Sequence, residues 1–163
     1  MRHARLFEMI KTTRISFGGT AAIVTSMALI VGLDAANAGR TAMVSALLIA
    51  AVADNLTDSL SVHVYQESER LEEREAFIGT VSNFVTRLVV CLTFVLIVVL
   101  FRTHVAAIGG IVWGMLLLTV LTYILARHRK VGAMSELGKH LAVALVVIFV
   151  SKGIGHWIIV HVT

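Results

Sequence analysis

Five apolar runs constrain this chain more than any other feature of its sequence. They cover residues 15–33, 42–65, 76–101, 105–126 and 141–162. At 1.5 Å per residue, a helix over each run can cross the roughly 30 Å hydrocarbon layer of a bilayer. The chain has 163 residues and only 15% of them are charged, whereas soluble domains average about 25%. We therefore predict an all-α membrane protein, with residues 15–163 forming a bundle of five transmembrane helices in a lipid bilayer.

The positions of Lys and Arg residues predict which side of the membrane each end of the chain occupies. They gather before the first run and between the fourth and fifth runs, at Arg2, Arg5, Lys11, Arg14, Arg127, Arg129, Lys130 and Lys139. The connections on the opposite side carry Arg40 and Arg102. Because cytoplasmic loops are enriched in Lys and Arg, we expect a multi-pass protein of the cell's inner (plasma) membrane. Its N-terminus would be cytoplasmic and its C-terminus outside.

Residues 1–14 form a basic arm ahead of the first span. Leu6, Phe7, Met9 and Ile10 make an apolar side of a possible helix, a pattern typical of amphipathic helices on the anionic inner leaflet. A basic tail that only sets topology explains the same residues. The net charge of +4 does not indicate a nucleic-acid partner, because the basic residues lie at the ends of apolar runs rather than along one face.

The second run changes from apolar to polar half-way along its length. At 100° per residue, Asp54, Asp58, Ser61 and Tyr65 lie on one stripe of a helix. Two carboxylates one turn apart suit a shared hard cation, or two like charges that make each other easier to protonate. An ionisable side chain inside a membrane costs about 2.5–3.5 kcal/mol on insertion scales and usually marks an ion or proton pathway. The stripe therefore predicts an ion-handling site.

A structural interpretation of the same acids stays open. Arg87 in the third run and Lys152 in the fifth each lie roughly ten residues from one end of their span, so we expect them near the midplane with Asp54. They could neutralise Asp54 and Asp58 in a closed polar network, which Asn83 would extend. In that case the acids would hold helices together without carrying an ion.

An acidic segment follows the second run on the predicted cytoplasmic side. Glu69, Glu72 and Glu73 share one helical face there. Such a cluster could collect divalent cations at the mouth of a pathway. The alternative is a solvated helix whose glutamates pair with Arg70 and Arg74.

Two stretches resemble the vacuolar iron transporter family. "FGGTAAIVTSMALIVGLDAA" is similar to the first span of that family, and "ADNLTDSLSVHVYQESE" to its second span. The resemblance covers about residues 14–75, and the number of spans also fits. It implies export of ferrous iron or manganese in exchange for protons, by a two-fold dimer with the path on its axis. By position, Asp54 takes the place of the family's second-span glutamate, Val62 that of its metal-contacting methionine, and Ala21 that of its first-span aspartate.

Two classes of function are therefore expected. The first is a transporter that moves divalent metal ions (iron or manganese) out of the cytoplasm with proton coupling, as a homodimer, with Asp54 and Asp58 at the midplane. The second is a non-transporting membrane scaffold or partner subunit, in which the Asp, Arg and Lys residues only hold helices together. The sequence contains no nucleophile–base pair and no cofactor motif, so we expect neither an enzyme nor a bound cofactor.

Overall fold

The computed structural model describes the backbone of residues 2–68 and 73–162, and the side chains of residues 18–66, 68, 74 and 77–162. Every regular element in these residues is a helix. In chain order they are α1 (Arg2–Ala35), α2 (Arg40–Ile49), η1 (Ala50–Asp54), α3 (Asn55–Ser68), α4 (Glu73–Leu100), α5 (Thr103–Arg129) and α6 (Ala133–His161). The elements α2, η1 and α3 follow one another without a break and make one rod.

Five helices are long and apolar enough to cross a membrane. The candidate spans are Gly18–Ala35, Arg40–Gln66, Phe77–Leu100, Thr103–Arg129 and Ala133–His161. The predicted all-α membrane bundle is confirmed, and most predicted ends of the runs lie within a few residues of these spans. The largest difference is the start of the last span, where α6 includes Glu136 and Lys139 ahead of the apolar run.

The basic arm is a straight continuation of the first span. Helix α1 begins at Arg2, so the backbone of residues 2–14 continues the same helix. At 1.5 Å per residue its 34 residues extend for about 51 Å, longer than the hydrocarbon layer. The amphipathic character of the arm stays a prediction, because its side chains lie outside the described residues.

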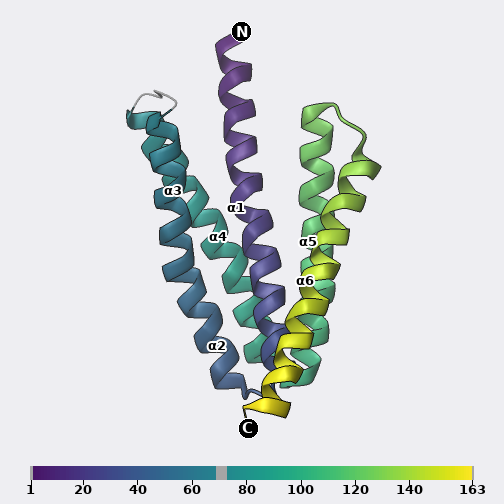
Figure 1. Cartoon of the computed structure of the whole chain (residues 1–163). Helices are drawn as coiled ribbons and strands as arrows, with labels where there is room; N and C mark the ends of the chain where they lie inside the picture. Colours follow the sequence, from purple (N-terminus) through teal and green to yellow (C-terminus); the bar gives the residue numbers. More distant parts are fainter. Residues whose placement is uncertain (1, 69–72, 163) are drawn as a thin grey trace.

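Helix α1 lies at the centre of the bundle. It packs against α4, α5 and α6, whereas the α2–η1–α3 rod packs mainly against α4. Successive spans run in alternating directions, so the two ends of the chain lie at opposite ends of the bundle (Figure 1). An odd number of crossings requires this arrangement, and it fits the predicted opposite locations of the termini.

The buried core lies between α1, α4 and α5. Its largest apolar side chains include Ile23, Met27, Ile30, Phe94 and Leu118, each at most 1% exposed. Large apolar side chains also cover the outside of the bundle, for example Val52, Leu56, Leu60 and Val64 along one face of the rod. An outer surface of this kind suits lipid rather than water as the surrounding solvent.

Candidate functional site

A π-helical turn interrupts the second span just before its polar half. Residues Ala50–Asp54 form this turn, and the backbone N–H of Asn55 donates to the carbonyl of Ala50, five residues back. The carbonyl of Ala51, the usual acceptor for that N–H, instead accepts a 2.7 Å bond from the side-chain Nδ2 of Asn55. Asn55 is 1% exposed, so its amide satisfies a buried carbonyl that the wide turn leaves free. Turns of this type are frequent at functional sites.

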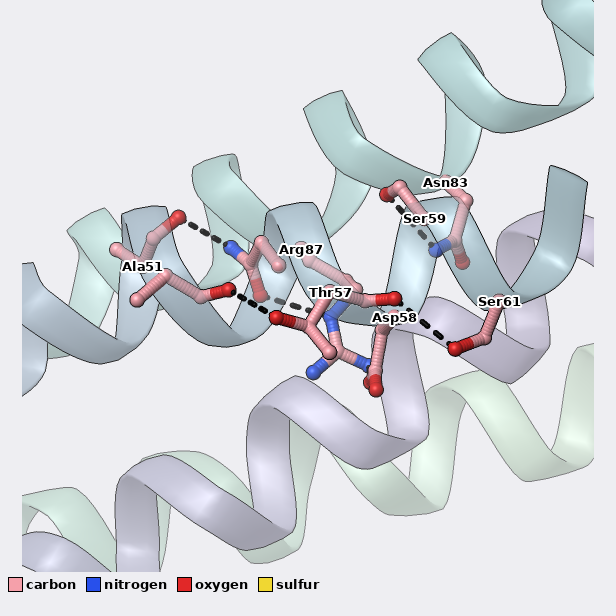
Figure 2. A network of polar contacts seen from close by, with 9 residues as sticks. Ala51, Thr57, Asp58, Ser59, Ser61, Asn83 and Arg87 are labelled. Atoms are coloured by element: carbon pink, nitrogen blue, oxygen red, sulfur yellow. Dashed lines mark hydrogen bonds and ion pairs between the residues drawn. The ribbon is translucent and has the colours of Figure 1, made fainter.

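Asn55 also connects the π turn to a buried arginine on α4. The Nε of Arg87 donates to the Oδ1 of Asn55 over 2.7 Å, and its Nη1 forms an ion pair with the Oδ2 of Asp58. Arg87 is 2% exposed, whereas the side chain of Asp58 is 43% exposed. Figure 2 shows Arg87 reaching toward Asp58 at the junction of the rod with α4. One of the two predicted site carboxylates is therefore already paired with a cation.

Asn83 extends this network by one turn of α4. Its Nδ2 donates to the Oγ of Ser59 over 3.3 Å, and its buried Oδ1 has no hydrogen-bond partner in the part of the chain that the structure describes. A Cβ added at Gly18 of α1 would lie 2.2 Å from this oxygen and 3.1 Å from the Cγ of Arg87. The missing side chain at Gly18 thus lets α1 pack directly on the network.

Asp54 is the carboxylate of this region that has no cation partner. It is exposed, and no hydrogen bond or ion pair joins it to any residue that the structure describes. It lies fourteen residues after Arg40 and twelve before Gln66 in the second span. At 1.5 Å per residue these separations are about 21 and 18 Å, which places Asp54 near the middle of this candidate span.

The hydroxyls beside Asp54 face outward as hydrogen-bond acceptors. Thr57 and Ser61 are exposed, and each donates its hydroxyl hydrogen to a carbonyl one turn back. Thr57 donates to Ala53 over 2.9 Å, and Ser61 donates to Thr57 over 3.0 Å. Because each hydroxyl hydrogen is already donated to a carbonyl, both hydroxyl oxygens can only accept further hydrogen bonds or bind a cation through their lone pairs. The predicted stripe therefore presents oxygen acceptors.

The structure does not bring Lys152 to these acids. Lys152 follows Ser151, whose carbonyl oxygen lies 3.3 Å from the Cβ position of Gly32, whereas Arg87 lies against Gly18. Fourteen residues of α1 separate these levels, or about 21 Å. Helix α6 also packs on α1 and α5 rather than on the rod. Of the predicted network, Asp58, Arg87 and Asn83 come together, and Lys152 and Asp54 take no part.

The predicted glutamate cluster falls largely outside the described residues. Glu69 and Glu72 lie in the undescribed segment, and Glu73 begins α4 with its side chain undescribed. Within the described part of the chain, no group of three or more His, Cys, Asp or Glu side chains is placed to hold a metal ion. The metal-ligand role predicted for Asp54, Asp58 and the three glutamates therefore stays a prediction.

Three network residues escaped the sequence-based prediction: Gly18, Asn55 and Ser59. Asn55 follows Asp54 in the sequence, but nothing about a single amide at this position indicated that it would be part of the site. Ser59 and Asn55 are four residues apart, so they share the face of the rod that meets α4. That spacing could have indicated a buried polar face opposite Asn83 and Arg87, which are also four residues apart.

No family model, no curated protein and no solved structure matches this chain.

Proposed function

We propose that this protein moves cations across a membrane and that the second span carries them. The observation that supports this most is the exposed, unpaired carboxylate of Asp54 near the middle of that span. A charged group in hydrocarbon costs about 2.5–3.5 kcal/mol on insertion scales. A proton or a monovalent metal cation bound at Asp54 would neutralise the carboxylate and remove this energetic cost. A group that carries a cation across a membrane needs this property.

The chemistry of the stripe fits hard cations. Asp54, Asp58, Thr57 and Ser61 supply carboxylate and hydroxyl oxygens, the ligand type that protons, alkali ions, Mg²⁺ and Mn²⁺ prefer. Iron or manganese as the cargo, proton coupling, a homodimer and a plasma-membrane location are expectations that rest on the sequence and the resemblance alone.

A second candidate function is a scaffold without transport. It is favoured by the buried network of Arg87, Asn55, Asp58, Asn83 and Ser59, which fastens the rod to α4. Buried polar groups that are bonded to one another can specify one packing of helices without any ligand. The scaffold function does not explain why Asp54 is exposed and lies outside this network.

Proteoliposomes separate the two candidates. We would load vesicles with a pH-sensitive dye or a Mn²⁺-sensitive dye, and compare the wild type with Asp54→Asn and Asp34→Asn. Asp34 is a matched control: its carboxylate lies at the end of α1 and contacts His104 at 3.0 Å. We expect cation flux in the wild type and in Asp34→Asn, and loss of at least about 90% of it in Asp54→Asn, as for removal of an essential charged group. Wild-type flux no greater than that of empty vesicles would support the scaffold.

A further inference from the structure

We propose that Arg87 sets the charge of the cargo, so that each chain takes one monovalent cation, a proton or an alkali metal ion, in preference to a divalent metal. This inference rests on the proposed transport function and narrows its substrate class. Arg87 acts in it as a specificity-determining residue that remains within the protein as a permanent internal cation.

The charges around Asp54 add up to one negative charge. The rod contributes Asp54 and Asp58, and α4 contributes Arg87, so the sum is (−1) + (−1) + (+1) = −1. Other titratable side chains that the structure describes on the rod, α4 and α1 have different contacts. His63 lies one turn after Ser59 and contacts Thr80 of α4, Cys91 is a buried free thiol, and Asp34 contacts His104 at the end of α1.

Arg87 cannot give up its place or its charge easily. A guanidinium stays protonated in proteins, and this one is 2% exposed and held at Nε by Asn55 and at Nη1 by Asp58. Gly18 of α1 packs against the aliphatic part of its side chain. Asp58 could bind a metal ion only if the Arg87 guanidinium moved away. That movement would break several buried contacts at once.

A monovalent ion neutralises this site, and a divalent ion does not. A divalent ion would leave one net positive charge near the membrane centre, where the low dielectric makes uncompensated charge costly. The donors also suit a hard ion, because the stripe carries oxygens and no His, Cys or Met. The buried Oδ1 of Asn83 has no hydrogen-bond partner among the described residues, and in Figure 2 it points to the α1 side of the network, as the Asp58 carboxylate does. It is an uncharged oxygen, so it leaves the charge sum unchanged.

The test changes the charge of the stripe without touching Arg87. Ser61→Asp places a third carboxylate on the exposed stripe, which makes the sum −2. Ser45→Asp is the matched control, because Ser45 is exposed on the same rod but lies on the other flank and in the α2 part. Proteoliposomes of each variant would be assayed for proton flux in sodium-free buffer, for sodium-dependent flux, and for Mn²⁺ uptake.

We expect the wild type and Ser45→Asp to carry a monovalent cation and to take up no Mn²⁺ above empty vesicles. Flux in sodium-free buffer identifies a proton, and flux only with sodium identifies an alkali ion. Ser61→Asp should take up Mn²⁺ at roughly tenfold or more the rate of empty vesicles, since a second net charge at contact distance strengthens the attraction of a divalent ion.

Two results would overturn the inference. Wild-type uptake of Mn²⁺ without any monovalent flux would reject the charge argument and leave the proposed transport function standing. Absence of every cation flux from the wild type would reject both. If Ser61→Asp does not fold, the wild-type comparison of monovalent and Mn²⁺ flux still decides the inference.

Discussion

At the scale of single residues, Asn55 makes two buried hydrogen bonds to different partners. Its Nδ2 satisfies the carbonyl that the π turn frees, and its Oδ1 accepts from Arg87. It thereby couples the backbone shape around Asp54 to the arginine that pairs with Asp58. Asn55 therefore connects the π turn to the Arg87–Asp58 ion pair.

Replacing Asn55 with Ala should lower the free energy of unfolding by about 2–3 kcal/mol, because a buried carbonyl and a charged donor each lose a partner. Thermal and denaturant unfolding in detergent would measure this loss. Thr57→Ala serves as the control, since the Thr57 hydroxyl is exposed and bonds only to its own helix, and it should cost under about 0.5 kcal/mol. Equal losses in the two variants would contradict the role given to Asn55.

At the scale of helices, glycines determine how closely α1 meets its neighbours. A Cβ on Gly114 of α5 would lie 2.3 Å from the sulfur of Met27, and one on Gly155 of α6 would lie 2.2 Å from the carbonyl oxygen of Gly32. Side chains such as Met27 can shift, but a backbone carbonyl cannot move without its helix. The contact between α1 and α6 is therefore the less tolerant of the two.

We expect Gly155→Ala to destabilise the protein by about 1–3 kcal/mol, the usual range for inserting a methyl group into a close contact. Gly153→Ala on the same helix is the matched control, because nothing lies within 4 Å of its Cβ position, and better helix propensity should make it neutral or slightly stabilising. The midpoint of thermal unfolding in detergent would report both. A stable Gly155→Ala protein would show that α1 and α6 are not in this close contact.

The spans themselves were predictable because bilayer thickness and helix rise set the length of an apolar run. The π turn was not. Residues 42–54 contain no Pro and no Gly, so nothing in their sequence indicates a break in the regular helix. The structure reveals the turn, because the side chain of Asn55 there donates to the Ala51 carbonyl in place of the Asn55 backbone N–H.

At the scale of the whole molecule, the rod stands beside a central bundle built around α1. Hydropathy places five helices in a membrane, but it does not say which helices are neighbours. The expected pairing of Lys152 with the acids failed for this reason: α6 packs on α1 and α5 rather than on the rod, and the residue before Lys152 lies at the level of Gly32 rather than of Gly18. The pairing of Asp58 with Arg87 was among the predicted alternatives, and the separate exposure of Asp54 required the packing of the rod on α4 to be known.

The central claim is that the second span holds one free acid and one acid occupied by Arg87 in the middle of a membrane. Dicyclohexylcarbodiimide tests it directly, because this apolar reagent modifies protonated carboxyl groups within bilayers. After treatment of the protein in liposomes, peptide mass spectrometry should find the adduct on Asp54 and little on Asp58. An excess of sodium should lower the amount of adduct where the cargo is an alkali ion, and a lower pH should raise it where the cargo is a proton. An adduct mainly on Asp58, or on neither residue, would contradict the account.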